Sequence, residues 1–432
     1  MPDLLLSGGY LLDLTDGSRH RADLLIRDGQ IVRLGDSIDA VTEADGAEVI
    51  DISGKLISPG WMDMHVHFRE PGQEHKETIE TGARAAAWGG FTAVACMPNT
   101  EPPIATRDVV EFVLARQKSL PVAVHPIGTV SKKREGNEMA EMGDMQRGGA
   151  VAFSDDGSPV QHGGLMRRAL EYARTLGAPI LGHEEDLTLN ADHGHMNEGA
   201  VATRLGLPGI PGLAEEAMIA RDALLAEFTG GHVHVCHIST ARAVDIVRRA
   251  KARGVPITAE ACPHHWALTD EAVAESGYDT HTKMHPPLRT AEDAQAIKDG
   301  LADGTIDVIA TDHAPHAPFE KEVEYIEAPF GILGLETCWG LTCRDLVEPG
   351  VLALHEAVYK LTVAPREILG LAVPRIEVGQ PAELTVFDAD TRWTFEERHI
   401  QSKSKNTPFA GAEMMGRAWG IVNRGRWVPS EG

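Results

Sequence analysis

The feature that most constrains the fold is a regular alternation of short apolar runs and longer helical stretches between Trp61 and Leu371. Eight apolar runs are predicted to be strands: residues 61–66, 92–97, 122–127, 150–153, 179–181, 232–235, 257–259 and 308–311. The predicted helices include residues 77–88, 107–117, 165–176, 215–227, 241–253 and 291–301. Strands that alternate with helices are typical of a parallel sheet, and eight units in roughly 310 residues predict a closed (β/α)8 barrel. An open, doubly wound sheet is the alternative that periodicity alone does not exclude.

Both ends of the chain consist of short β-like runs separated by turns. The runs are residues 4–6, 24–26, 30–34 and 48–52 at one end, and 375–378, 384–387, 419–422 and 427–428 at the other. Asp28-Gly29 between two apolar runs is a hairpin signal. Chain termini often lie close together, so we expect residues 1–60 and 372–432 to form one composite β domain, a small β-sandwich, beside a barrel of residues 61–371.

The charge and composition exclude several classes of partner. Acidic residues outnumber basic ones by 64 to 40, and the net charge of −24 repels phosphate backbones, so we expect no nucleic acid partner. No apolar run reaches the ~18 residues that span a membrane, and the start Met1-Pro2-Asp3 lacks the basic region of a signal peptide. The five cysteines form no C-x-x-C pair, which is typical of a reducing compartment. We therefore expect a cytoplasmic protein without a membrane partner.

Six side chains of the types that bind metals lie at the ends of predicted parallel strands. His65 and His67 occupy positions i and i+2 of the first strand, so both imidazoles point to the same face. The other four each follow a later strand, and they are Asp156, His183, His237 and Asp312. In a barrel these strand ends converge on one mouth, which predicts a divalent metal site there. A set of nitrogen and carboxylate ligands without thiolate favours zinc, with manganese or cobalt as alternatives.

Such a site predicts hydrolysis, or its reverse, at an amide-type carbonyl. If a carboxylate bridges two metals, the site turns water into hydroxide near neutral pH and polarises a carbonyl oxygen. Other histidines, among them His264 and His265, lie in predicted loops or helices, and we expect their imidazoles to be solvated or hydrogen-bonded.

Motifs over nearly the whole chain resemble those of the bacterial type I dihydroorotases, in the amidohydrolase superfamily. They are Gly60–Gly72, Met97–Thr100, Phe153–Gly157, Cys236–Thr240, Met284–Arg289, Ala310–His316, Glu327–Gly331 and Lys405–Phe409. The resemblance implies a (β/α)8 barrel with a β domain from both termini. It also implies zinc-dependent, reversible opening of dihydroorotate to N-carbamoyl-aspartate in pyrimidine synthesis.

The resemblance assigns a role to each of the six predicted ligands. His65 and His67 would hold one zinc ion, and a second would be held by His183 and His237. Asp156 would bridge the two ions, at a position where many relatives have a carboxylated lysine; Asp155 is the neighbouring alternative. The role implied for Asp312 is to bind metal and to shuttle the proton.

The resemblance also implies a substrate-binding set. Its members are His67, Arg69, Asn99, His285, His316, Phe330 and Gly331. Arg69 would grip the substrate carboxylate through two parallel hydrogen bonds, with Asn99 and His316 as further partners. The main chain of Phe330 and Gly331 would meet the pyrimidine ring. His285 replaces the usual Asn of the family, and the segment from Ala314 to Glu327 is a candidate lid.

Two alternative functions remain open at this point. The first is another cyclic amidohydrolase, such as an allantoinase or a hydantoinase, although Asp156 in place of lysine and the pair Arg69 and Asn99 favour dihydroorotase. The second is a non-catalytic, dihydroorotase-like subunit that scaffolds aspartate transcarbamoylase. Homo-oligomerisation and association with a transcarbamoylase are the partner expectations beyond the small-molecule substrate.

Overall fold

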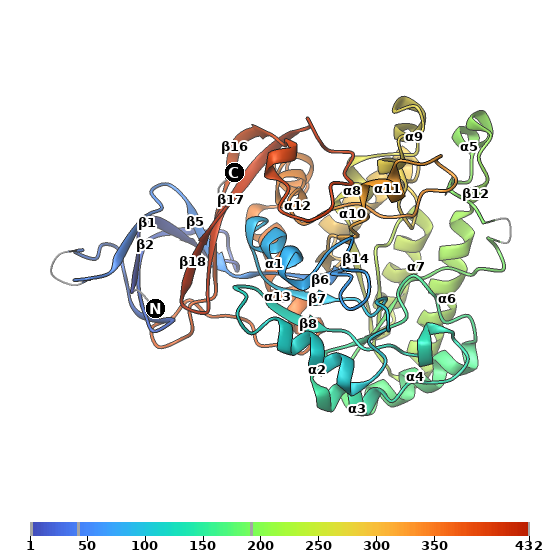
Figure 1. Cartoon of the computed structure of the whole chain (residues 1–432), viewed down its shortest axis with the longest axis horizontal. Coiled ribbons are helices and arrows are strands. Elements are labelled where there is room, and N and C mark those ends of the chain that lie inside the picture. The colour runs from blue at the N-terminus through green and yellow to red at the C-terminus, as the bar shows by residue number, and fades with distance from the viewer. Residues whose placement is uncertain (1–2, 41–43, 191–192, 431–432) are drawn as a thin grey trace.

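The computed structural model describes residues 3–40, 44–190 and 193–430, and it consists of a barrel beside a β-sheet unit (Figure 1). The barrel strands are β6 (Trp61–Val66), β7 (Phe91–Cys96), β8 (Ala123–Pro126), β9 (Phe153–Ser154), β10 (Ile180–Gly182), β13 (Val233–Val235), β14 (Ile257–Ala261) and β15 (Val308–Ile309). Neighbouring strands within the runs β6-β7-β8 and β9-β10-β13-β14-β15 are all parallel.

Two bridges close the barrel. Gly128, just after β8, pairs in parallel with Phe153 of β9, and Val66 of β6 pairs with His313 beyond β15. The second join includes a hydrogen bond of 2.9 Å from the His67 amide to the His313 carbonyl. The predicted closed (β/α)8 barrel is therefore confirmed, and the open doubly wound sheet is wrong.

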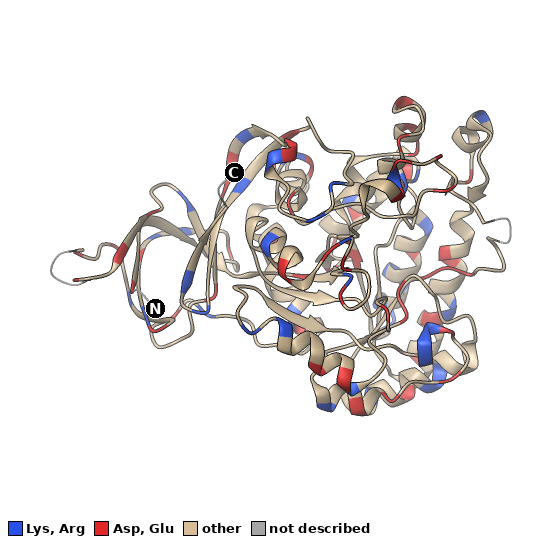
Figure 2. Cartoon of the chain, viewed as in Figure 1, with Lys and Arg blue, Asp and Glu red and all other residues tan. Residues whose placement is uncertain are grey.

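Helices surround the barrel and cover the outer faces of its strands. The longer ones are α1 (Ile79–Trp88), α2 (Arg107–Arg116), α3 (Met142–Gly148), α4 (Gly163–Leu176), α6 (Gly212–Thr229), α7 (Ala241–Ala252), α10 (Ala291–Ala302) and α13 (Leu354–Ile368). In α7, Ala243, Val244 and Val247 are buried on one face, and the Thr240 hydroxyl caps the N-terminus. Charged residues of both signs are mixed along the outer helices and loops (Figure 2). All six helices expected from periodicity are present, with ends shifted by a few residues.

Shorter elements fill the connections on the barrel. They are η1 (Lys132–Arg134), β11 (Met196–Asn197), α5 (Ala200–Leu205), β12 (Gly209–Ile210), α8 (Pro263–Ala267), α9 (Glu271–Glu275), η2 (Thr280–Thr282), α11 (Pro318–Lys321), α12 (Cys338–Thr342), η3 (Cys343–Val347) and η4 (Glu397–His399). No described helix has both the length and the apolar character needed to cross a membrane.

Both ends of the chain contribute to one eight-stranded sheet. Its strands are β1 (Leu4–Leu12), β2 (Arg19–Arg27), β3 (Gln30–Gly35), β4 (Glu48–Asp51), β5 (Leu56–Pro59), β16 (Leu384–Thr394), β17 (Glu413–Asn423) and β18 (Arg426–Pro429). The order is β18-β17-β16-β5-β1-β2-β3, with β4 paired to β1, and the antiparallel pair β5-β16 joins the two ends. Asp28-Gly29 forms the predicted turn between β2 and β3. The exact domain boundaries at residues 60 and 371 stay a prediction.

One predicted strand is wrong. Residues 375–378 lie in an irregular connection rather than a strand. Pro374 and Pro381 flank this run and cannot donate to a sheet, and Gly379 takes a positive φ of 89° in a turn. The local apolar character that suggested a strand serves instead to pack Ile376 against the core of the β unit.

Candidate active site

The mouth at the carboxyl ends of the barrel strands contains an open pocket of about 520 Å³. Five of the six predicted metal ligands line it, and so do all the residues predicted to contact substrate. His65, the sixth ligand, is fully buried directly behind it, with its Nε2 atom 3.6 Å from Asp156 Oδ1. Residues that are far apart in the sequence thus converge on one cavity, because each follows a different strand of a closed barrel.

The chain leaves several of these strands in an unusual backbone conformation. Arg69, His237 and Asp312 have positive φ angles of 59°, 34° and 49°. Such values are uncommon for residues other than glycine and cost free energy, so the surrounding structure must hold them in place. The sharp turn after each strand directs these side chains into the mouth.

The Asp156 carboxylate lies between two pairs of histidines. Its oxygens are 3.6 Å from His65 Nε2 and 3.5 Å from His67 Nε2. On the other side, Asp156 Oδ1 is 3.6 Å from His237 Nε2 and 3.8 Å from His183 Nδ1. Ligands of a tetrahedral zinc ion are about 3.3 Å apart, given bonds of about 2.0–2.1 Å, so these gaps suit cations held between the groups.

The Asp312 carboxylate completes the half of the cluster formed by His65 and His67. Asp312 Oδ1 is 2.9 Å from His67 Nε2 and 3.5 Å from His65 Nε2. His65 Nε2 and Asp156 Oδ1 are buried without a hydrogen-bond partner among the described residues. Because an unpaired buried polar atom is costly, these two orphaned atoms fit a cation at the centre of the cluster.

The charges of the cluster also fit a cation. Burial would raise the pKa of Asp156 and Asp312, but the neighbouring histidines outweigh it and hold both values below their usual range. Burial would lower the pKa of His65, but Glu260, Asp312 and Asp156 raise it to about 10. The carboxylates are therefore ionised and draw positive charge to the histidines between them, a role that a divalent ion would fill.

Two carboxylates that sequence reasoning missed orient His65. Glu260 Oε1 is 2.5 Å from His65 Nδ1, which leaves Nε2 facing the cluster, and Glu260 Oε2 is 3.1 Å from His234 Nε2. Asp63 accepts a hydrogen bond from the His65 amide and one from the Thr311 amide, which ties β6 to the segment just after β15. Burial raises the pKa of Asp63 to about 6. A carboxylate within a buried strand, as in Ile257–Ala261, is the signal that could have identified Glu260.

The structure distinguishes the two neighbouring aspartates. Asp155 does not line this pocket. Its carboxylate accepts hydrogen bonds from the amides of Val130 and Ser131 at 2.9 and 3.1 Å. Asp156 instead faces the histidines. The geometry brings Asp156, not Asp155, to the cluster.

Arg69 and His316 form one wall of the pocket with Phe330. Arg69 is buried, its Nε donates to the Pro315 carbonyl at 3.2 Å, and its Nη2 is 3.4 Å from His316 Nε2. His316 Nε2 is also 2.8 Å from the Phe330 carbonyl. No ion pair among the described residues includes Arg69, so its guanidinium is a buried cation that none of their carboxylates pairs with.

Asn99 and His285 also line the pocket. Asn99 Oδ1 accepts a hydrogen bond from His67 Nδ1 at 2.7 Å, so this side chain orients a predicted metal ligand; its predicted contact with substrate stays a prediction. His285 Nε2 is 2.9 Å from Glu185 Oε2, and its ring stacks on Phe330 with centroids 4.8 Å apart. Glu185 was missed by sequence reasoning.

Gly331 occupies a position that only glycine fits. Its φ is +123°, and a Cβ atom there would lie 2.7 Å from the Ala314 Cβ. The main chain of Gly331 can therefore approach the pocket closely.

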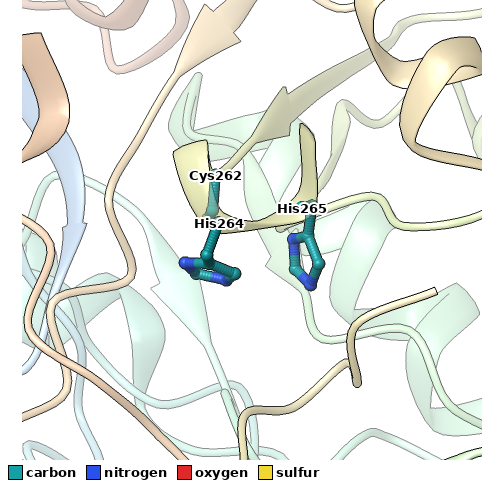
Figure 3. Close-up of side chains that lie close together, drawn as sticks. All are labelled: Cys262, His264 and His265. Atoms are coloured by element: carbon teal, nitrogen blue, oxygen red, sulfur yellow. The ribbon is translucent and has the colours of Figure 1, made fainter. Parts of the chain in front are cut away.

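A second group of donor atoms lies in α8, close to the cluster but outside the pocket lining. Cys262, His264 and His265 project from one turn, with one donor atom each within 4.8 Å of the others (Figure 3). Burial raises the pKa of the Cys262 thiol well above its usual range and lowers that of His264 to about 4. His265 Nε2 donates to the Pro286 carbonyl at 3.0 Å, as expected for a hydrogen-bonded imidazole, whereas His264 Nε2 is buried without a partner among the described residues.

Solved structures with the same architecture include hydantoinases. The L-hydantoinase (dihydropyrimidinase) of Arthrobacter aurescens matches with a TM-score of 0.85 at 24% identity, covering 100% of this chain and 97% of that one. The D-hydantoinase (dihydropyrimidinase) of a Thermus species matches with a TM-score of 0.80 at 27% identity, covering 99% and 96%. The closed barrel, the flanking β unit and the histidine–aspartate cluster therefore define an amidohydrolase-type barrel enzyme.

Proteins with similar sequences show which family within this enzyme class the chain belongs to. The family model described as dihydro-orotase-like matches residues 54–243. The dihydroorotase of Pelotomaculum thermopropionicum is 53% identical over 425 residues, and that of Syntrophotalea carbinolica is 50% identical over 424, each covering 98% of both chains. The chain belongs to the dihydroorotase family.

Proposed function

We propose that this chain is a zinc-dependent dihydroorotase, which interconverts dihydroorotate and N-carbamoyl-aspartate in pyrimidine synthesis. The observation that carries the proposal is the pairing of two features in one pocket. Asp156 lies between two histidine pairs, and Arg69 is a buried cation that forms no ion pair with a carboxylate among the described residues. The first feature suits two metal ions, and the second suits an anionic substrate.

The ligand set divides between two ions. His65, His67 and Asp312 are proposed to hold one zinc ion, and His183 and His237 the other, with Asp156 shared between them. When bound, the two ions supply an activated water near neutral pH and polarise the carbonyl under attack. Glu260 and Asn99 keep the His65 and His67 rings in the orientation that this requires.

Asp312 is proposed to move the proton. The histidines beside it hold its pKa below its usual range, against the effect of burial, so the group begins the ring-opening reaction as a carboxylate. It accepts a proton from the attacking water and donates it to the amide nitrogen as the ring opens. The reverse reaction uses the same group in the opposite order, as microscopic reversibility requires.

Arg69 is proposed to bind the substrate carboxylate. A guanidinium matches a carboxylate with two parallel hydrogen bonds, and a buried cation gains more from an anionic partner than an exposed one does. His316 and Asn99 line the same pocket, and the main chain of Phe330 and Gly331 is proposed to contact the ring.

The test compares substrates and metal content in one preparation. We expect turnover of dihydroorotate without comparable turnover of hydantoin or allantoin, and about two zinc ions per chain by elemental analysis. Turnover of hydantoin in preference to dihydroorotate would support a hydantoinase instead. Metal-free protein without activity would support the alternative of a non-catalytic, dihydroorotase-like subunit that scaffolds aspartate transcarbamoylase.

Asp312→Ala tests the proton shuttle directly. We expect ring-opening activity to fall by at least about a thousandfold, because general acid–base catalysis contributes about 10²–10⁴-fold and a metal ligand is also lost. Asp390→Ala, at an exposed aspartate, is the matched control.

The proposal also includes a cytoplasmic location, homo-oligomers and association with aspartate transcarbamoylase. Cell fractionation tests the location, and size-exclusion chromatography with and without the transcarbamoylase tests the two kinds of assembly.

A further inference from the structure

Two lysines, Lys283 and Lys321, are buried beside the segment that ends in Phe330 and Gly331. Their exposed fractions are 1% and 3%. Lysine is almost never this buried unless a carboxylate pairs with it, yet no ion pair among the described residues includes either side chain. The two amines therefore need another explanation.

The Lys321 amine is held by main-chain carbonyls alone. Its Nζ donates to the carbonyl of Pro329 at 2.7 Å, to that of Thr280 at 3.1 Å and to that of Lys283 at 3.5 Å. The Thr280 hydroxyl in turn donates to the Lys321 carbonyl at 2.6 Å. This lysine thus joins α11 and the residues before Phe330 to the turn at η2.

The Lys283 amine binds the same segment from the other side of that turn. Its Nζ donates to the Tyr325 carbonyl at 2.7 Å and to the Ile326 carbonyl at 2.9 Å. It also lies 4.7 Å from the centroid of the Phe330 ring, a cation–π contact. The Lys283 carbonyl accepts a hydrogen bond from the Gly331 amide at 2.9 Å.

These contacts supply hydrogen bonds that the segment lacks. In the described part of the chain, the carbonyls of Tyr325, Ile326 and Pro329 accept no main-chain hydrogen bond. An apolar side chain would fill the same space without the cost of burying an amine, but it would leave these carbonyls unpaired. Burial lowers the pKa of Lys283 to about 8 and that of Lys321 to about 7. A protonated amine has three N–H donors and a neutral one has two, so both forms serve the two carbonyls at Lys283, and the neutral form of Lys321 gives up only one of its three contacts.

We propose that Lys283 and Lys321 are positioning residues that form a latch, which holds the main chain of Phe330 and Gly331 against the pocket before substrate binds. The latch acts on binding because preorganised main-chain groups need no ordering when the ring arrives. Its effect on the substrate constants rests on the proposed function, since the ligand in question is the dihydroorotate ring.

Kinetics of Lys283→Met and Lys321→Met test the latch, with Lys118→Met at an exposed lysine as the matched control. We expect the KM for dihydroorotate to rise at least about tenfold in the first two, with kcat changed less than about threefold. Zinc content should match the wild type, because neither amine contacts a ligand. An unchanged KM, or a loss of kcat together with zinc, would overturn the proposal.

Amide hydrogen exchange tests whether the latch exists in the ligand-free protein without relying on enzyme activity. In the ligand-free wild-type protein, the buried, hydrogen-bonded amides of Ala328 and Gly331 should exchange as slowly as those of the barrel strands, and at least about tenfold faster in either lysine variant. Fast exchange of these amides in the wild type would refute the latch even if neither variant folds. If the exchange result holds but the wild type does not turn over dihydroorotate, the proposed function fails and the latch remains.

Discussion

Replacing Arg69 with methionine is the most direct test of substrate recognition. Methionine retains much of the apolar stem and removes the guanidinium, which the chain pairs with no carboxylate among the described residues. Each charge-assisted hydrogen bond contributes about 1.5–3 kcal/mol, so loss of a two-point contact costs about 3–6 kcal/mol. We therefore expect kcat/KM for dihydroorotate to fall by about 10²- to 10⁴-fold.

The assay uses two substrates that differ only in the carboxylate. Dihydrouracil has the ring of dihydroorotate without that group, so Arg69→Met should change its kcat/KM by less than about threefold. Arg69→Lys keeps the charge but loses the fork of donors, and we expect an intermediate loss on dihydroorotate. Arg168→Met, at an exposed arginine, should match the wild type on both substrates.

One result would refute the reasoning. Arg69 also donates to the Pro315 carbonyl, at the start of the candidate lid. If Arg69→Met lowered kcat/KM equally for dihydroorotate and dihydrouracil, the residue would act by supporting that loop and not by binding the carboxylate.

Three further predictions concern the metal cluster and the barrel. Glu260→Gln should weaken zinc binding about 10- to 100-fold, measured by competition with a chelator, because His65 loses the carboxylate that orients it; wild-type affinity would contradict this role. Exhaustive chelation should abolish activity and lower the melting temperature, with both restored by added zinc, since the carboxylates of the cluster then repel one another; an unchanged melting temperature would argue against a cation there. Burial lowers the pKa of His125 to about 4, so the unfolded chain binds its proton first, and stability should fall as pH drops from about 6.5 towards 4. Between pH 7.5 and 5 this loss is about 2 kcal/mol, and His125→Gln should reduce the decline in urea unfolding by that amount; an identical decline would refute it.

The identity of most of the cluster could be predicted from the sequence, because it depends on local pattern. The position of a side chain along a strand decides which face it occupies, and the end of a parallel strand in a barrel leads to one mouth. His65, His67 and Asp312 are recognisable on that basis alone. The hydrogen-bond partners of these ligands could not be predicted from the local sequence pattern. Glu260 orients His65, and Asn99 orients His67, but each partner comes from a different strand or strand end than the histidine it contacts.

What the sequence by itself determined is the alternation that makes a barrel, the metal-binding types at its strand ends, and the turn at Asp28-Gly29. Only the tertiary structure decided that residues 375–378 are irregular, that Asp156 faces the cluster, and that two lysines fasten the pocket wall. The physical reason is the separation along the chain of the residues that interact. Periodicity and turn chemistry act between neighbours in the chain, whereas hydrogen-bond partners and buried charges are set by groups that meet only when the barrel closes.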